Sequence, residues 1–175
     1  MTSPEFSRTV RADTIGAQPL AKRIAAEPGE RQALARRFGI LSLDLLEAEL
    51  SVARPNEDAL AAGRFTAEVV QSCAITGEPV PARIEEDFEI HFRPLPTGGE
   101  PEEEVELAEQ ELDVMFYDAA MVDLGEAVAQ TLALALDPYP RAPGAEDALK
   151  QAGVIDESEA GPFGALAGLR DKLGK

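Results

Sequence analysis

Three long stretches of the chain alternate apolar and polar residues with a period of two. They span residues 45–54, 64–75 and 82–93. In the third stretch, ARIEEDFEIHFR, charged residues such as Glu85, Asp87 and Glu89 alternate with apolar residues on the other side, namely Ile84, Phe88, Ile90 and Phe92. A period of two places alternate side chains on opposite faces of a β-strand. Each stretch therefore predicts a long strand with one buried face and one face in water.

Weaker patterns predict further elements. Residues 6–15 and 111–117 alternate over shorter lengths, which predicts two more strands. A helix is expected from about Glu30 to the residue before Gly39, because glycine is common just after a helix C-terminus. Residues 24–26 are expected to begin a helical turn that Pro28 and the following glycine interrupt.

The most regular helical pattern covers residues 123–136. Its apolar residues recur at helical spacing and form one stripe, which consists of Leu124, Val128, Leu132 and Leu136. Asp123 and Glu126 have the spacing of a capping box, and Pro138 is expected to stop the helix. A helix with this much apolar surface needs a sheet to bury it.

Strand runs followed by helices predict an α+β fold. The expected architecture is an antiparallel sheet of about five strands, open or barrel-like, covered by one or two helices. Residues 1–140 are expected to form a single domain. Residues 141–175 are expected to be a Pro/Gly-rich and acidic linker that ends in a short amphipathic helical tail, whose apolar residues include Phe163, Leu166 and Leu169.

The charge of the chain is concentrated in its middle. The chain has 16 Lys and Arg against 33 Asp and Glu, a formal net charge of −17. Residues 55–140 contain three of the basic and twenty of the acidic residues, and so contain the whole excess. An acidic body repels phosphate backbones and attracts basic proteins, so DNA is not an expected partner. The simplest alternative is that the acidity only keeps the protein in solution.

Cysteine content and hydropathy bear on the cellular compartment. Cys73 is the only cysteine, so an internal disulfide framework is excluded. No apolar run approaches the roughly 20 residues that span a bilayer, and residues 1–13 lack the apolar stretch of a secretory signal. We therefore expect a cytoplasmic protein without a membrane partner.

Catalysis and metal binding receive little support from the sequence. The only histidine, His91, falls on the polar side of its predicted strand, and one Cys with one His cannot supply four ligands to zinc. Cys73 is expected to be a small buried residue, with a reactive thiol as the alternative. A run of glutamates lacks the Asp/Gly pattern of a calcium loop and is expected to be solvated, namely Glu102, Glu103, Glu104 and Glu106. We expect no cofactor and no enzymatic activity.

The central segment AEVVQSCAITGEPVPARIEEDFEIHFRP, residues 67–94, resembles the signature of the YceD-like family of large ribosomal RNA accumulation proteins. The family pattern has a strand, a cysteine followed three residues later by Cys or Thr, a turn with proline, and a second strand with a central aromatic residue. The matching positions here are Cys73, Thr76, Glu78, Pro79 and Phe88. The flanking segments ERQALARRFGI, VDLGEAVAQTLALALDPYPRAPG and PFGALAGLRDKL resemble the alphaproteobacterial branch of the family.

The resemblance implies a role in accumulation or maturation of 23S ribosomal RNA as a non-catalytic ribosome biogenesis factor. Some family members have cysteine pairs that could bind zinc, but Thr76 replaces the second cysteine here, so a zinc site is not transferred. Two modes of action remain open. The chain could contact 23S RNA through clustered arginines, namely Arg31, Arg36 and Arg37. Alternatively, its acidic sheet face and glutamate run, together with the tail, could bind a basic ribosomal or RNA-processing protein.

The sequence is also compatible with two other functions. The chain could be an acidic adaptor or chaperone for a basic partner outside ribosome assembly. It could also bind a small ligand, although no convergent set of polar residues supports that function.

Overall fold

The computed structural model describes residues 4–56, 58–95, 114–117 and 121–153. These residues belong to two compact units. The first contains Met1–Gln71 and Pro81–Pro138, and the second contains Ser72–Val80 and Tyr139–Lys175. The sequence-based domain boundary at residue 140 stays a prediction.

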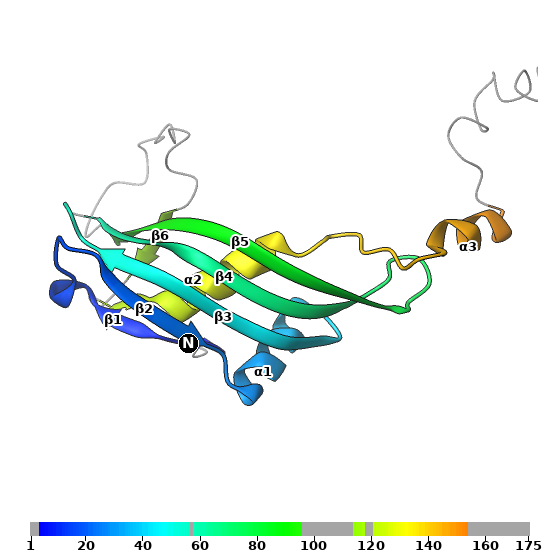
Figure 1. Ribbon diagram of the computed structural model, residues 1–175, viewed down its shortest axis with the longest axis horizontal. Helices are drawn as coiled ribbons and strands as arrows, with labels where there is room; N and C mark the ends of the chain where they lie inside the picture. Colours follow the sequence, from blue (N-terminus) through cyan, green and yellow to red (C-terminus); the bar gives the residue numbers. More distant parts are fainter. Residues whose placement is uncertain (1–3, 57, 96–113, 118–120, 154–175) are drawn as a thin grey trace, which may run out of the picture. The chain divides into compact units, whose positions relative to one another are not determined.

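The first unit is built on a five-stranded sheet (Figure 1). Its strands follow the order β2-β3-β4-β5-β6, with the bounds β2 Leu20–Ala25, β3 Ser42–Ala53, β4 Ala59–Ser72, β5 Pro79–Pro94 and β6 Val114–Tyr117. The pairs β2–β3 and β3–β4 are antiparallel, whereas β6 pairs with β5 in parallel. The predicted α+β class and the number of strands in the sheet are confirmed, although β2 takes the place of the strand expected over residues 6–15. The sheet is mixed rather than purely antiparallel, and it is open, with β2 and β6 at the edges of its described part.

Two short strands form a separate ladder. β1, Thr9–Arg11, pairs antiparallel with β7, Met121–Asp123, so that Val10 lies opposite Val122. A single 3₁₀ turn, Ala12–Thr14, follows β1 and buries Ala12. The strand expected over residues 6–15 is therefore real but shorter, because the chain turns as soon as its pairing with β7 ends.

Helix α1, Pro28–Phe38, has recognisable signals at both ends. Proline is favoured in the first helical turn, and Glu27 and Glu30 form a reciprocal capping box before it. Gly39 ends the helix in the left-handed conformation, with φ of 68°, where a residue without Cβ has no steric penalty. The helical turn expected at residues 24–26 was wrong, because Ile24 pairs with Ala48 in the sheet.

Helix α2, Leu124–Ala135, crosses one face of the sheet (Figure 1). Asp123 is its N-cap and accepts hydrogen bonds from the backbone N–H groups of Gly125 and Glu126. The predicted stripe is confirmed at Leu124, Val128 and Leu132, which are at most 1% exposed. The sheet therefore has one face covered by α2 and one face whose side chains point away from the core.

The core lies between α2 and the covered face of the sheet. Its completely enclosed large side chains are Phe6, Phe65, Phe92, Leu34, Leu46, Leu124, Leu132, Val52, Val69, Val122 and Val128. The inward residues of β3 and β4 also include several alanines, such as Ala48 and Ala67, whose small size gives α2 room to approach. Burial of each large apolar side chain contributes about 1.5–3 kcal/mol, so this layer is the main source of stability.

Strands β3 and β4 approach each other closely at Gly63. This glycine pairs with Leu50, and a Cβ atom at its position would lie 2.2 Å from the carbonyl oxygen of Glu49. Any larger residue would push the two strands apart. Gly63 therefore helps to set the spacing and register of the central strands.

The second unit contains a tight turn after β4 and helix α3, Ala145–Gln151. Gly144 precedes α3 in the left-handed conformation, with φ of 88°. A small cluster of buried residues, Cys73, Ala142 and Ala145, holds this unit together, with Ile75 and Val80 packed against it.

Candidate functional site

The side of the sheet that faces away from α2 is lined by charged residues. Strand register creates this arrangement, because residues directly opposite each other on paired strands point to the same face. Glu49 of β3 lies opposite Arg23 of β2 and Arg64 of β4. We call the following side chains the acidic face: Arg23, Glu47, Glu49, Arg64, Glu68, Arg83, Glu85, Asp87 and Glu89.

Each arginine of the acidic face is bound by carboxylates of the same face. The Arg64 guanidinium donates two hydrogen bonds of 2.8 Å to the two carboxylate oxygens of Asp87. Arg83 donates to Glu68 and to Glu85, both at 2.7 Å. On β2 and β3, Arg23 donates to Glu47 at 3.0 Å and lies 3.7 Å from Glu49. The arginines therefore pair with carboxylates of three strands.

The net charge of this surface is negative. Six carboxylates face three arginines, so the acidic face has a formal charge of −3. The hydrogen bonds from Arg64 hold the pKa of Asp87 below its ordinary value. Glu49 and Asp87 are 76% and 71% exposed as side chains, and the Glu89 carboxylate lies 3.5 Å from the imidazole of His91. These carboxylates are therefore accessible to a partner.

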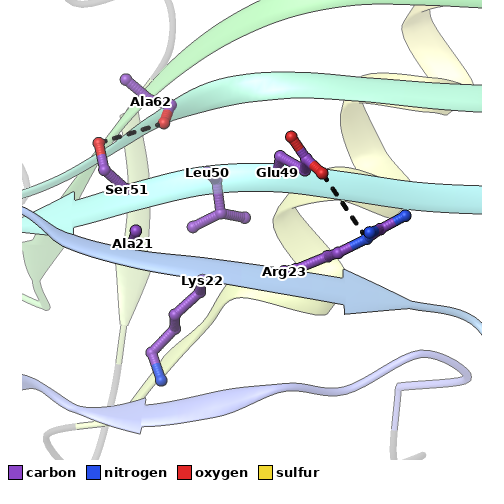
Figure 2. Close-up of a pocket in the computed structure, with 7 residues that line it drawn as sticks. All are labelled: Ala21, Lys22, Arg23, Glu49, Leu50, Ser51 and Ala62. Carbon is purple, nitrogen blue, oxygen red and sulfur yellow. Dashed lines mark hydrogen bonds and ion pairs between the residues drawn. The ribbon is translucent and has the colours of Figure 1, made fainter.

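A shallow depression of about 440 Å³ marks one part of the acidic face (Figure 2). Small residues of three neighbouring strands form one side of it, because Ala21 pairs with Ser51 and Ser51 pairs with Ala62. Figure 2 shows Arg23 reaching toward Glu49 at its other side. The depression gives room for a protruding side chain beside a carboxylate. The sequence contains the alternation behind this face, but the cross-strand pairing of its arginines with its carboxylates depends on register.

The predicted RNA-contact arginines lie on α1, but they do not form one free basic patch. Arg37 donates two hydrogen bonds, of 2.8 and 2.6 Å, to the two carboxylate oxygens of Glu126, and a third of 3.1 Å to Glu5. Arg31 donates to the carbonyl oxygen of Ala26 at 2.8 Å. Only Arg36 is exposed without a hydrogen bond or ion pair to another described residue. Two of the three arginines thus have structural partners.

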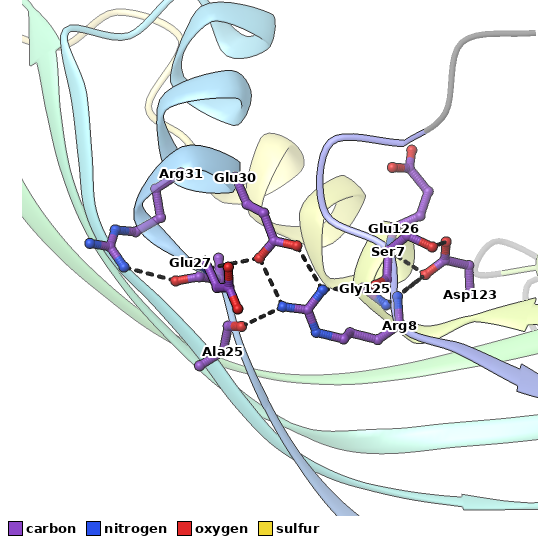
Figure 3. A network of polar contacts seen from close by, with 10 residues as sticks. Ser7, Arg8, Ala25, Glu27, Glu30, Arg31, Asp123, Gly125 and Glu126 are labelled. Atoms are coloured by element: carbon purple, nitrogen blue, oxygen red, sulfur yellow. Dashed lines mark hydrogen bonds and ion pairs between the residues drawn. The ribbon is translucent and has the colours of Figure 1, made fainter.

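A polar network joins the N-terminal segment to both helices (Figure 3). The Arg8 guanidinium donates to both carboxylate oxygens of Glu30, at 2.7 and 2.8 Å, and lies 4.7 Å from the centre of the Phe6 ring. The backbone N–H of Arg8 and the hydroxyl of Ser7 donate to Asp123, the N-cap of α2. Glu126 is therefore not the reciprocal capping residue that its spacing suggested, since it binds Arg37 instead.

The turn that contains Cys73 is ordered by the sulfur atom. The Cys73 thiol is 4% exposed, and its Sγ accepts hydrogen bonds from the backbone N–H groups of Ala142, at 3.3 Å, and Thr76, at 3.4 Å. These bonds lower the pKa of Cys73 to about 6. Thr76 also donates its hydroxyl to Glu78, and Gly77 has φ of 77°. The family-motif residues of this turn thus belong to one compact arrangement.

Other predicted site residues are distributed differently. Pro79 begins β5, whereas Phe88 lies in the core of the first unit, with its ring centre 6.4 Å from that of Phe65. The predicted partner-binding residues Glu102, Glu103, Glu104, Glu106, Phe163, Leu166 and Leu169 lie outside the described residues. Within the described ranges, no group of three or more His, Cys, Asp or Glu side chains could hold a metal ion. Among the helices of that same part of the chain, none has the length and apolar character to cross a membrane.

Comparison with known proteins adds one finding. No curated protein and no solved structure was found to match the chain. A family model described as large ribosomal RNA subunit accumulation protein YceD matches residues 61–170, which is more than half of the 175 residues. The match contains most of strand β4, strands β5 to β7, helices α2 and α3 and the Cys73 turn. The chain therefore belongs to the YceD family of large ribosomal RNA subunit accumulation proteins.

Proposed function

We propose that this protein is a non-catalytic factor that promotes accumulation of 23S ribosomal RNA by binding a basic ribosomal or RNA-processing protein. Family membership supports the pathway. The acidic face supports the mode of action, because it presents accessible carboxylates on three adjacent strands, several of them paired with arginines. Such a surface speeds and orients the encounter with a basic partner.

The charge distribution favours a protein partner over direct RNA contact. Proteins that bind RNA usually present a basic face, since phosphate neutralisation supplies most of the affinity. Here the exposed sheet face is negative, and the Arg37 guanidinium already binds Glu126 and Glu5. Arg36 alone offers too little positive charge for RNA binding at physiological salt. Direct contact with 23S RNA is therefore the second candidate mode.

A non-catalytic role is supported by the surroundings of the two most reactive side chains. The Cys73 sulfur is enclosed by backbone donors, and His91 lies beside Glu89 on an open sheet surface. Catalysis needs a nucleophile and a base within a shaped pocket. In the described part of the chain, neither the enclosed thiol nor the imidazole on the open surface has such surroundings.

Depletion of the protein in its own host tests the proposed pathway. We expect the ratio of 23S to 16S RNA to fall, and we expect re-expression of the full chain to restore it. An unchanged ratio after complete depletion would contradict the role in large-subunit RNA accumulation. That result would leave an acidic adaptor or chaperone for a basic partner outside ribosome assembly as the alternative function.

The two modes of action can be separated in the same strain. Retention of 23S fragments on a filter by the purified chain, measured at low and physiological salt, tests direct RNA contact. We expect no retention at physiological salt, and we expect Arg36→Ala to restore the RNA ratio in depleted cells as well as the wild type does. Retention that Arg36→Ala abolishes would favour the RNA-contact mode instead.

A further inference from the structure

The acidic face also indicates which surface of a basic partner it accepts. Resting on the proposed function, we propose that its occupant is the RNA-binding surface of a large-subunit ribosomal protein, and that ribosomal RNA displaces the chain from it. The acidic face would thus occupy a phosphate-binding surface until the RNA arrives.

The first argument is the order of the carboxylates. Asp87 is held by two hydrogen bonds from Arg64, and Glu85 by one from Arg83. A surface whose side chains are already fixed loses less conformational entropy when a partner binds. Ordered anions in rows resemble a phosphate backbone more closely than freely rotating glutamates do.

The second argument is geometry. Residues that alternate along a strand are spaced by roughly 7 Å, and adjacent strands lie roughly 4.8 Å apart. Glu85, Asp87 and Glu89 form one such row on β5, and Glu47 and Glu49 form a parallel row two strands away on β3. Between the rows, β4 presents Arg64. The acidic face thus presents two rows of carboxylates with a row of mixed charge between them. This arrangement suits a partner whose arginine and lysine side chains lie on both sides of a bound nucleic-acid backbone.

The third argument is charge density, which sets the direction of exchange. Duplex nucleic acid has one negative charge per roughly 1.7 Å of its axis. The acidic face has six carboxylates on three strands, at most one per roughly 7 Å along each strand, and its three arginines neutralise half of them. The proposal therefore requires the same basic surface to bind ribosomal RNA more tightly than it binds this protein, so that transfer of the partner to RNA is downhill.

The test uses the full-length chain and the protein mixture extracted from salt-washed large subunits of the host. The chain is cross-linked to the mixture, and the captured proteins are identified and then purified singly. We expect basic ribosomal proteins, and we expect association rate constants that fall at least about tenfold between low and physiological salt or on neutralisation of the face.

A matched pair of variants isolates the acidic face. The test variant combines Glu49→Gln, Glu85→Gln and Glu89→Gln. The control removes the same charge elsewhere with Glu86→Gln, Glu146→Gln and Asp147→Asn, because Glu86 points to the other side of β5 and the others lie on α3. The proposal predicts loss of binding for the test variant and wild-type binding for the control. Equal loss in both would overturn it.

The decisive step is addition of 23S RNA to the preformed complex of the chain with one purified ribosomal protein. Release of the chain, with the ribosomal protein transferred to RNA, is the expected result. A stable complex of all three components would overturn the proposal of a shared surface, while leaving the proposed function intact. Direct binding of the chain to RNA without the ribosomal protein would overturn it as well. The proposed function fails separately, when depletion leaves the ratio of 23S to 16S RNA unchanged.

Discussion

Arg37 of α1 and Glu126 in the first turn of α2 form a two-pronged ion pair, with N–O distances of 2.8 and 2.6 Å. The side chains are 33% and 16% exposed, so the pair is partly shielded from water. It joins two helices through residues that are 89 positions apart in sequence. Arg37, which the sequence suggested as an RNA contact, thus links two helices of the first unit.

We predict that Arg37→Ala lowers the free energy of unfolding by about 1–2 kcal/mol, because it leaves the Glu126 carboxylate without its main partner. Solvent screening keeps this loss below that expected for a fully buried ion pair. Arg37→Lys retains the charge but loses the planar fork, so it should lose part of this amount. Urea unfolding at neutral pH measures both, and Arg36→Ala is the control. An Arg37→Ala variant as stable as Arg36→Ala would show that the ion pair adds no stability.

The same pair predicts a difference at acidic pH. Burial alone would raise the pKa of Glu126, but hydrogen bonds from Arg37 and Gln130 outweigh it and hold the pKa below its ordinary value. A carboxylate with a lowered pKa stabilises the folded state at any pH above its ordinary pKa. This stabilisation is lost as the pH falls through the lowered pKa of the folded state. The difference in stability between wild type and Arg37→Ala should therefore shrink on acidification below about pH 4.5. A difference that stays constant to pH 3 would contradict this linkage.

Asp123 is expected to be the most sensitive polar residue of the first unit. Its carboxylate accepts hydrogen bonds from two backbone N–H groups of α2, from the backbone of Arg8 and from the hydroxyl of Ser7. Asp123→Ala should cost about 1–2 kcal/mol or more, since loss of an N-cap alone costs about that much. Asp123→Asn keeps one acceptor oxygen and should cost less. Thermal unfolding of both variants checks the order, and equal losses would show that the acceptor oxygen retained by Asn contributes little, which would contradict the N-cap role.

Gly63 is predicted not to tolerate a side chain. The Cβ of Gly63→Ala would overlap the backbone of β3 at Glu49 and Leu50, and relief requires strand separation at a cost of about 1–3 kcal/mol or more. Gly29→Ala is the matched control, because its Cβ would meet no atom within 4 Å at the start of α1. That change should be neutral or stabilising by up to about 1 kcal/mol. Similar unfolding midpoints for the two variants would be incompatible with the close approach of β3 and β4.

The Cys73 thiol should titrate near neutrality. Its pKa of about 6 lies below the ordinary value, so the thiolate stabilises the Cys73 turn at high pH, and this contribution is lost as the pH falls through about 6. The rate of alkylation by iodoacetamide, measured against pH, should have its midpoint there. Ala142→Pro removes the N–H that contributes most to the shift and should move the midpoint upward. A midpoint near the ordinary thiol value in the wild type would refute the role of these backbone donors.

The salt bridges of the acidic face are expected to matter for binding rather than for stability. Arg64 and Asp87 are 63% and 71% exposed, and exposed pairs contribute little. A double-mutant cycle of Arg64→Ala and Asp87→Ala should therefore give no measurable coupling in urea unfolding. Strong coupling would indicate that the pair serves the fold, and would weaken the proposed docking surface.

Local pattern predicted the long strands and both longer helices because their signals are contained within a few residues. The alternation around Leu46 and Phe92, the glycine after α1 and the stripe around Val128 all correspond to the structure. The edge strand β2 was missed, because its six residues bury only Ile24 and so give almost no period. The parallel direction of β6 could not be predicted either, since pairing direction is not encoded within a strand.

The acidic face shows the same limit for the functional site. Which carboxylate binds which arginine depends on register, and register depends on contacts such as that of Gly63 with Leu50. The use of Arg37 as a structural residue was equally inaccessible, because Glu126 is remote in sequence and its spacing from Asp123 suggested a capping role. The residue types alone indicated the net charge of the chain. The positions of the charged side chains on its surface could be known only from the fold.

The pairing of Arg64 with Asp87, and of Arg83 with Glu85, has a consequence for self-association. A broad open sheet can stack on a second copy when its faces are apolar, at a spacing of roughly 10 Å between sheets. Here two copies would each bring a surface of formal charge −3 whose arginines are already bound by their own carboxylates. Like charges would repel, and no free cation of the acidic face would remain to bridge them. The same ion pairs that prepare the surface for a basic protein thus disfavour stacking of two copies through their acidic faces.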